Sequence, residues 1–461
     1  MIQFCLVFIF LYFTSSIAGL RIENRRLRRF FLFGALVVWV LTLLVYASFL
    51  DPWERIVFSC FGTPWLIKNC VRDVLDGRIQ RPLPLFKEII YRFVWPGMST
   101  RPFQFDVAAN QSDGALFVRG YIPALLGIAL LLCFSYASYG LQDIPLGVLG
   151  LLPFFLLVHL GFVGVLTSLI RLWRHPVPLL FDAPLQSDGL RDFWSRRWNR
   201  PFIEMNRALF FPWFVRRVGR TNAVLLTFIL SGFLHELGIS YPAGGGWGWP
   251  TLYFFLQGLL IIVEERCATY FSKLPRLFTR LWTWICVLAP LPLLFHSEFR
   301  SAVILPVYRQ VGDYLMTYSL HSYMSFCLLM AGLGHFLVLV ASVQVPSRLR
   351  WKEELGRLST FNRKIMWNYG FFILMLIIAF GVETLLFRQD MVDGVPSALG
   401  MATLICGFWL LRILVDLFYF SHSDWPSGPE FVIGHTLLNS LFLFFVLTYG
   451  TVVGWHLWLN N

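Results

Sequence analysis

Two clusters of polar side chains combine residue types that can carry out chemistry. The first reads S-G-F-L-H-E-L-G over residues 231–238, inside a long apolar stretch. An ionisable side chain in such a stretch is costly to bury and usually faces a cavity or a partner. His235 and Glu236 are about 100° apart around a helix, so they point in different directions. Ser231 lies near the His235 face and leaves room for a substrate, while Glu236 can tune the site or bond a neighbouring helix. A histidine that only bridges two helices is the alternative.

The second cluster reads F-W-S-R-R-W-N-R over residues 193–200, and its Asn199 lies 36 residues before His235. Arginine side chains bind phosphate groups in a bidentate geometry. The candidate substrate contacts in this cluster are Arg196, Arg197, Trp198 and Arg200. The same pattern is also typical of an interfacial anchor, with tryptophan at the headgroup level and arginine on lipid phosphates.

The composition indicates that both clusters belong to a membrane protein. Hydrophobic residues make up 57% of the 461 residues and charged residues only 14%, whereas about a quarter of a soluble globular chain is charged. The charges also lie in short stretches between long apolar runs. This excludes disorder, a fibrous repeat and an ordinary cytosolic enzyme.

The apolar runs predict the fold class, because a helix needs about 20 apolar residues to cross the hydrocarbon core. About twelve such runs can be identified, at 2–19, 30–50, 54–70, 119–140, 144–170, 221–240, 251–269, 278–297, 318–341, 366–387, 396–419 and 431–457. We therefore expect an all-α, multi-pass transmembrane protein of about twelve spans, with amphipathic or interfacial helices in its cytoplasmic loops.

The distribution of arginine gives the orientation, since positive residues gather on the cytoplasmic side. Residues 171–220 alone contain ten arginines against four acidic residues. Within this stretch, 202–218 is apolar but interrupted by charges and a proline, which favours a helix lying along the interface. The net charge of +12 is thus assigned to topology and anionic lipid headgroups. Nucleic acid is not expected as a partner.

The eight cysteines are scattered and form no C-x-x-C pair. Most of them lie inside or at the ends of apolar runs, where a free cysteine behaves as a small packing residue. The spacing predicts neither a disulfide framework nor a zinc site.

Taken together, the two polar clusters resemble the membrane-bound O-acyltransferase superfamily and, within it, the wax synthase-like branch. The signature of that branch reads F-W-x-R-R-W-N and then S-G-x-x-H-E, as residues 193–199 and 231–236 do here. The proline-rich run H-P-V-P-L-L-F-D-A-P-L at 175–185 is also similar. The resemblance is strong over about 171–266, weaker over the rest of 1–315, and does not extend to about the last 145 residues.

This resemblance implies transfer of an acyl group from an acyl thioester, normally acyl-CoA, to a hydroxyl, with acyl-CoA as co-substrate and no other cofactor or metal. It assigns His235 as the general base and Asn199 as the asparagine paired with it. A neutral imidazole can take the proton of an alcohol as the alcohol attacks the thioester carbon. The Asn199 amide can donate to the oxyanion, and the arginines of residues 193–200 can bind the phosphates of CoA.

We expect two parts of the chain: an O-acyltransferase domain at 1–315 and a C-terminal accessory transmembrane module of unknown function at 316–461. The expected acceptor is a lipophilic alcohol dissolved in the bilayer. Acetylation of a terpenoid or sterol-like secondary metabolite is the main variant of the same chemistry. The membrane is the inner membrane in a prokaryote or an endoplasmic-reticulum-type membrane in a eukaryote, and the sequence predicts no oligomeric state.

A non-catalytic lipid binder or a transporter is the alternative from another functional class. In that case His235 and Glu236 would belong to a polar pathway through the membrane. Transporters often carry paired, interrupted spans in their two halves, and the sequence contains no such pair. The enzyme is therefore the favoured prediction.

Overall fold

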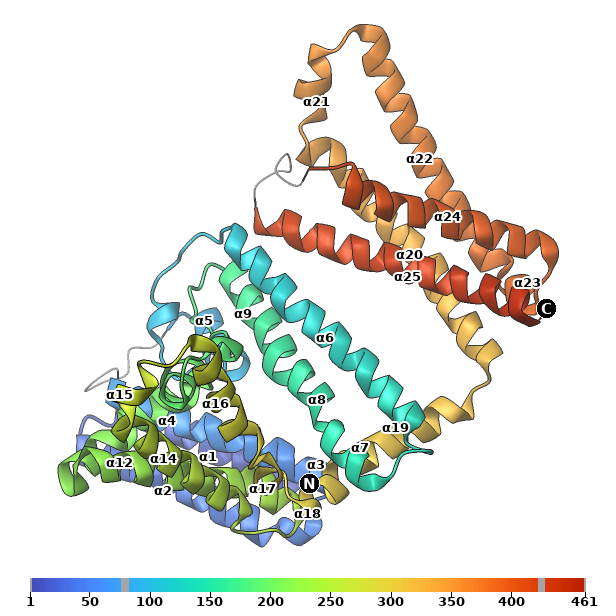
Figure 1. Ribbon diagram of the computed structural model, residues 1–461. Coiled ribbons are helices and arrows are strands. Elements are labelled where there is room, and N and C mark those ends of the chain that lie inside the picture. The colour runs from blue at the N-terminus through green and yellow to red at the C-terminus, as the bar shows by residue number, and fades with distance from the viewer. Residues whose placement is uncertain (1, 76–82, 422–427, 460–461) are drawn as a thin grey trace. The chain divides into compact units, whose positions relative to one another are not determined.

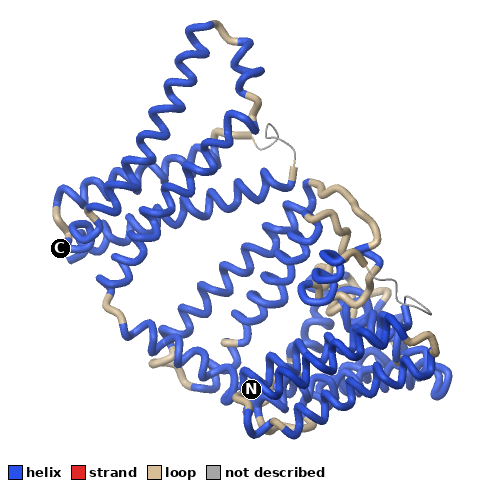
Figure 2. The backbone as a smooth tube through the Cα atoms, turned by 180° about the vertical axis from the view of Figure 1, so that it is seen from behind, coloured by secondary structure: helices blue, strands red, loops and turns tan. Residues whose placement is uncertain are grey.

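The computed structural model describes residues 2–75, 83–421 and 428–459. Helices joined by loops make up these ranges, and no strand occurs in them (Figures 1 and 2). The prediction of an all-α protein is confirmed.

The chain divides into two compact units, which comprise residues 1–109 with 119–313 and residues 110–118 with 314–461. The boundary at 313/314 lies two residues before the expected boundary at 315/316. The helices of the first unit are α1 (Ile2–Arg21), α2 (Arg25–Val45), α3 (Pro52–Val57), α4 (Thr63–Leu75), α5 (Leu85–Ile89), α7 (Asp143–Leu149), α8 (Leu151–Phe154), α9 (Val163–Leu172), α10 (Leu190–Asp192), α11 (Arg200–Leu209), α12 (Phe211–His235), α13 (Tyr241–Ala243), α14 (Trp249–Arg266), α15 (Ala268–Phe271), α16 (Arg276–Leu288), α17 (Leu291–Leu294) and α18 (Ser297–Phe299). The helices of the second unit are α20 (Leu320–Arg348), α21 (Trp351–Glu354), α22 (Thr360–Leu386), α23 (Arg388–Asp393), α24 (Pro396–Phe418) and α25 (Pro429–Leu459). Two further helices, α6 (Gln111–Ala137) and α19 (Leu305–Thr317), contribute residues to both units.

Nine helical segments of the described chain are long and apolar enough to cross a membrane. They are Arg25–Val45, Gln111–Ala137, Asp143–Leu172, Phe211–Ala243, Arg276–Leu294, Leu320–Arg348, Thr360–Leu386, Pro396–Phe418 and Pro429–Trp458. Each overlaps one of the twelve predicted runs. The other three runs correspond to α1, to α3 and α4 joined by a π-helical turn at Phe58–Gly62, and to α14, which ends in Glu264, Glu265 and Arg266. The multi-pass character is confirmed, and the number of spans stays a prediction.

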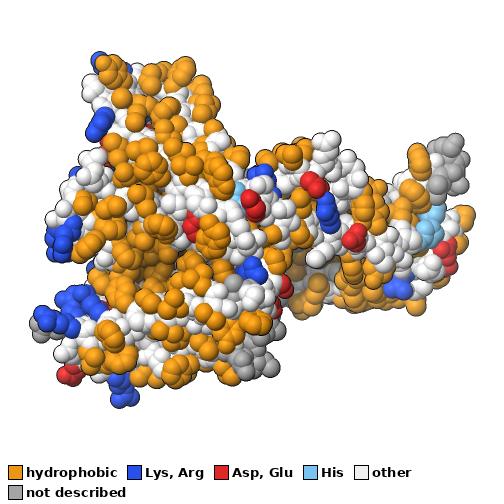
Figure 3. All heavy atoms as spheres, turned by 90° about the horizontal axis from the view of Figure 1, so that it is seen from below, with side chains coloured by type: hydrophobic (Ala, Val, Ile, Leu, Met, Phe, Trp, Pro, Cys, Tyr) orange, Lys and Arg blue, Asp and Glu red, His pale blue; other side chains and the backbone are white. Residues whose placement is uncertain are grey.

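Many large apolar side chains are exposed on these helices, as expected for surfaces that face lipid. Phe30 of α2 and Phe418 of α24 expose 73% and 84% of their surface. Figure 3 shows hydrophobic side chains over much of the face that it presents. Because water-exposed apolar patches of this extent are rare on soluble monomers, the surface fits an integral membrane protein.

In the first unit, helices α12 and α14 pack closely along each other, and they frame the site described below. Two glycines permit this approach. A Cβ on Gly232 of α12 would lie 2.6 Å from the Thr251 Cα, and one on Gly258 of α14 would lie 3.1 Å from the Phe228 Cβ. Both separations are shorter than ordinary van der Waals contact, so a larger residue at either position would push the helices apart.

The second unit has its own apolar core between α20, α22, α24 and α25 (Figure 1). His335 lies inside this core and is fully buried. Its Nδ1 donates to the Ala331 carbonyl at 2.7 Å, its Nε2 accepts from Trp409 Nε1 at 3.0 Å, and its ring stacks on Phe445. Both ring nitrogens are therefore satisfied, which is the arrangement of a structural histidine.

Candidate active site

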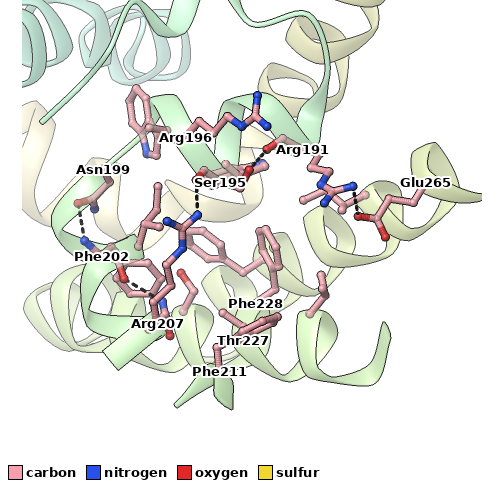
Figure 4. A pocket seen from close by; sticks show the side chains of 18 of the residues that line it. Arg191, Ser195, Arg196, Asn199, Phe202, Arg207, Phe211, Thr227, Phe228 and Glu265 are labelled. Carbon is pink, nitrogen blue, oxygen red and sulfur yellow. Dashed lines mark hydrogen bonds and ion pairs between the residues drawn. The ribbon is translucent and has the colours of Figure 1, made fainter. Parts of the chain in front are cut away.

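A pocket of about 330 Å³ lies in the first unit between α11, α12, α14 and the segment 191–199 (Figure 4). Helix α12 supplies one wall, through Phe211 at its start and through a row of residues on one face. These residues are Arg220, Val224, Thr227, Phe228, Ser231 and His235. Since a helix rises 1.5 Å per residue, this row runs for about 22 Å along the helix. The pocket is therefore a groove with Arg220 at one end and His235 at the other.

The imidazole of His235 is held in one tautomer. Its Nδ1 lies 2.7 Å from the Ser231 carbonyl oxygen. Because a carbonyl oxygen can only accept a hydrogen bond, Nδ1 carries the proton and Nε2 carries the lone pair. Within the described ranges, Nε2 has no hydrogen-bond partner. His235 thus brings an unused proton acceptor to the groove, and Ser231 acts through its backbone carbonyl.

Asn199 lines the same pocket and caps α11. Its backbone is left-handed, with φ of 46°, a conformation that asparagine tolerates better than most residues. The side-chain Oδ1 accepts from the Phe202 backbone N–H at 3.3 Å. This bond commits the oxygen to the helix, and Nδ2 finds no partner in the part of the chain that the structure describes. The amide N–H groups therefore remain available to a bound molecule.

Four arginines line the groove, and they make its outer part strongly basic: Arg191, Arg196, Arg207 and Arg220. Arg191 pairs with Glu265 at 3.3 Å, and Arg207 donates to the Ser195 carbonyl at 3.2 Å (Figure 4). The Arg196 side chain is 78% exposed. With Glu265 as the one acid in this lining, the arrangement favours a ligand with several negative charges.

The predicted residues Arg197 and Arg200 do not line this pocket. The Arg197 Nε bonds Asp192 at 2.5 Å, and the Arg200 guanidinium bonds Asp182 at 3.2 Å. Backbone bonds join the same two stretches, from Asp182 N to the Arg197 carbonyl and from Arg200 N to the Leu180 carbonyl. The geometry does not support the expected contact of these two arginines with phosphate. They stabilise the loop that carries Asn199.

Trp198 lines the pocket and is fixed in an aromatic stack. Its indole lies nearly parallel to Phe193, with ring centroids 5.2 Å apart, and to His159, at 5.5 Å. Phe181 meets it edge-on at 4.8 Å. The predicted contact residue therefore serves as a rigid part of the wall.

Glu236, another predicted contact residue, lies outside the lining and caps α14. Its Oε1 accepts from Gly248 N, Thr251 N and Thr251 Oγ1, at 3.1, 3.0 and 2.6 Å. A carboxylate at a helix N-terminus is stabilised by the unpaired N–H groups there. Glu236 thus fixes α14 relative to His235. Glu236 and His235 form no hydrogen bond with each other, as their different directions on the helix predict.

Glu264 holds the segment 191–199 against α14, a role that no sequence pattern indicated. Its carboxylate accepts from the backbone N–H of Leu190 at 2.8 Å and of Arg191 at 3.2 Å, and from Trp282 Nε1 at 3.2 Å. Gly189 leaves room for it, because a Cβ there would lie 2.8 Å from the Glu264 Oε1. This contact sets the wall that carries Asn199.

Glu204 anchors α11 from the side away from the groove. Its carboxylate accepts from the Met98 backbone N–H at 3.1 Å. Burial raises the pKa of this carboxyl, although the bonds to backbone N–H groups act in the opposite direction. Glu204, which interrupts the apolar run 202–218, therefore holds α11 to the backbone of Met98 and Ser99.

Several residues of the lining were not among the predicted site residues. Val224, Thr227 and Phe228 could have been found by following His235 backwards at helical spacing. Phe254 and Ile261 come from α14, and their approach depends on how α12 and α14 pack. Among the described residues, no group of three or more His, Cys, Asp or Glu side chains is arranged to hold a metal ion.

Comparisons with known proteins match the part of the chain that contains this site. Residues 177–257, which include Asn199 and His235, match the membrane bound O-acyl transferase family. Acyl-CoA--sterol O-acyltransferase 1 of Arabidopsis thaliana is 22% identical over 321 residues, covering 65% of this chain and 90% of the relative. Probable long-chain-alcohol O-fatty-acyltransferase 2 of Arabidopsis thaliana is 34% identical over 115 residues, covering 23% and 33%. These matches support the predicted superfamily and confirm the prediction of an O-acyltransferase. The wax synthase-like branch stays a prediction.

Proposed function

We propose that this enzyme transfers an acyl group from acyl-CoA to the hydroxyl of a lipophilic alcohol, in the manner of the wax synthase-like branch. The observation that carries the proposal is the tautomer of His235, which leaves its Nε2 as an unused proton acceptor. Its Nδ1 proton is tied to the Ser231 carbonyl, and its Nε2 is open at the inner end of a groove whose outer part is lined by arginines. This arrangement suits a base acting on a neutral hydroxyl beside a polyanionic donor.

The chemistry follows from these atoms. His235 Nε2 takes the proton of the alcohol as its oxygen attacks the thioester carbon. The carbonyl oxygen becomes an oxyanion, to which the Asn199 Nδ2 group donates. When the intermediate collapses, the C–S bond breaks, and the CoA sulfur leaves with the proton that the imidazolium returns. The products are an ester and CoA, and the step needs no further cofactor.

The groove matches the shape of the donor. Acyl-CoA has a phosphorylated head and a long arm that ends in the thioester. Arg191, Arg196, Arg207 and Arg220 would bind the phosphates, with the arm running along α12 toward His235. Arginine is suited to this task because its planar group forms two parallel bonds to phosphate.

The acceptor class is supported by the surroundings and by the relatives. His235 ends α12, within a segment that is long and apolar enough to cross the membrane, where lipophilic alcohols partition. The names of the two relatives specify a sterol and a long-chain alcohol. Acetylation of a terpenoid or sterol-like hydroxyl is a variant of the same reaction.

The experiment is an acyl-transfer assay with the purified full-length protein in lipid nanodiscs. Labelled acetyl-CoA and palmitoyl-CoA are each offered with a sterol, a terpenoid alcohol and a long-chain alcohol. We expect a labelled ester and free CoA in equal amounts, both dependent on the alcohol. A folded protein that binds a labelled alcohol, yet releases no CoA from either donor, would contradict the proposal and favour a lipid binder or a transporter.

A further inference from the structure

Aromatic side chains close the inner end of the groove around His235. The Phe254 ring lies with its centroid 4.2 Å from that of the imidazole, and the Phe202 ring lies at 6.4 Å. Phe254 is only 2% exposed. A group attached to the thioester carbon at His235 therefore meets the Phe254 ring almost at once.

Phe254 is held in place by its neighbours. Trp194 meets it edge-on at 5.7 Å, and Trp194 Nε1 donates to Gln257 Oε1 at 3.1 Å. Gln257 in turn donates from Nε2 to the Cys286 carbonyl at 2.8 Å. Rotating the Phe254 ring away from His235 would require Trp194 to move, which would break the partly buried hydrogen bond to Gln257.

The space behind Phe254 is filled by the core of the first unit. Phe254 belongs to one packed cluster with Tyr253, Ile239, Leu294, Phe299 and Val303, all of them buried. Protein cores are packed as densely as organic crystals. A long acyl chain cannot continue past Phe254 without displacing this core.

The dimensions of the groove lead to the same conclusion. The row from Arg220 to His235 is about 22 Å long. The arm of CoA has thirteen bonds from phosphorus to sulfur, and at roughly 3.6 Å for each three bonds it extends about 16 Å. About 6 Å remain, which is room for only a few carbon atoms. The volume of about 330 Å³ also lies at the lower end of the ~300–1,000 Å³ range of ligand pockets.

We propose that this enzyme uses short-chain acyl donors, from acetyl to about butyryl, and that Phe254 sets the limit. The proposal rests on the function proposed above and specifies its donor class. The bonds made and broken are those of the transfer already described. Phe254 acts as a specificity-determining residue because its ring occupies the position that further acyl carbons would take.

The test measures kcat/KM for acetyl-, butyryl-, octanoyl- and palmitoyl-CoA with one accepted alcohol, in nanodiscs. For the wild-type protein we expect the acetyl value to exceed the palmitoyl value at least a hundredfold. Phe254→Ala should reduce the acetyl-to-octanoyl ratio at least tenfold, through a gain with octanoyl-CoA. Phe254→Leu, which retains more of the contact with His235, should change it in the same direction by less. The matched control is Phe103→Ala, since Phe103 is equally buried in the first unit but outside the groove, and it should leave the ratio unchanged.

The outcomes separate this proposal from the one on which it rests. Equal or faster transfer from palmitoyl-CoA by the wild-type protein would overturn the short-chain limit and leave the acyltransferase function intact. An acetyl preference that persists in active Phe254→Ala and Phe254→Leu proteins would overturn the role of Phe254. If both variants are inactive, the wild-type donor series alone decides the chain length, and Phe254→Trp, expected to lower the butyryl value relative to acetyl, decides the role of the ring. No CoA release with any donor and alcohol would instead contradict the proposed function.

Discussion

At the residue scale, Asn199 caps a helix and is proposed to bind the oxyanion, and the two roles use different atoms. Asn199 lines the groove, its Oδ1 caps α11 through the Phe202 N–H, and its Nδ2 has no partner among the described residues. The left-handed backbone, with φ of 46°, restricts the residue types that fit this position. A substitution can therefore preserve the cap and remove the donor.

Asn199→Asp should separate these roles. Aspartate caps helices as well as asparagine does and tolerates the left-handed region, so the melting temperature should stay close to that of the wild type. Its carboxylate cannot donate to an oxyanion, so transfer should fall by about 10²–10³-fold. Thermal unfolding and turnover of Asn199→Asp and Asn199→Ala are compared. Asn199→Ala should have both a lower melting temperature and a lower turnover. Near-normal turnover of Asn199→Asp would exclude the oxyanion role.

At the scale of elements, two adjacent carboxylates of α14 have opposite effects on the groove. Glu264 is bonded to two backbone N–H groups of the segment 190–191, whereas Glu265 forms a partly exposed ion pair with Arg191. Removing Glu264 leaves those N–H groups unsatisfied, at about 1–3 kcal/mol for each that is buried. Exposed ion pairs contribute only about 0–1 kcal/mol.

We therefore expect Glu264→Ala to lower both the melting temperature and kcat, because the wall that carries Asn199 loses its anchor. Glu265→Ala should leave the melting temperature nearly unchanged and lower the KM for acyl-CoA, since Arg191 is released and one negative charge is removed. Thermal unfolding and steady-state kinetics of the two variants provide the comparison. Identical behaviour of both would contradict the assigned anchor.

The break in α12 at Gly219 determines how Arg220 enters the groove. Gly219 has φ of 76° and ψ of 170°, a combination that essentially only glycine adopts. No atom lies within 4 Å of where its Cβ would be, so a substitution acts through the backbone alone.

Gly219→Ala should cost about 1–3 kcal/mol of stability and raise the KM for acyl-CoA, because Arg220 is displaced. Gly400→Ala is the control, since Gly400 lies inside α24 with equal space around it, and it should be neutral or slightly stabilising. Thermal unfolding and KM are measured for both. An unchanged KM in Gly219→Ala would show that the break does not position the arginine.

Local sequence patterns could predict much of this structure, although not the details of the site. Apolar length alone identified nine of the helical segments, and the run at 54–70 is helical with a π-helical turn at Phe58–Gly62. The directions of Arg196 and Arg197 could not be predicted, because residues 193–197 form a π-helical turn that changes the angle per residue. The closure of the groove by Phe254 depends on the packing of α12 on α14, which no local pattern encodes.

At the scale of the whole molecule, each unit contains a histidine with the same local geometry. The Nδ1 of His235 and of His335 each lies 2.7 Å from the carbonyl four residues earlier. Their Nε2 atoms differ, because that of His335 accepts from Trp409, whereas that of His235 is open to the groove. The second unit thus supplies a matched structural control for the proposed catalytic role of His235.

The central claim is tested most directly by comparing His235→Ala with His335→Ala, as full-length proteins in the same membrane preparation. The measurement is CoA release per folded molecule, together with thermal unfolding. We predict that the activity of His235→Ala falls by about 10²–10⁴-fold, the usual contribution of a general base, while the protein stays folded. His335→Ala should unfold at a lower temperature, while each folded molecule transfers at close to the wild-type rate. Wild-type turnover in folded His235→Ala would contradict the account.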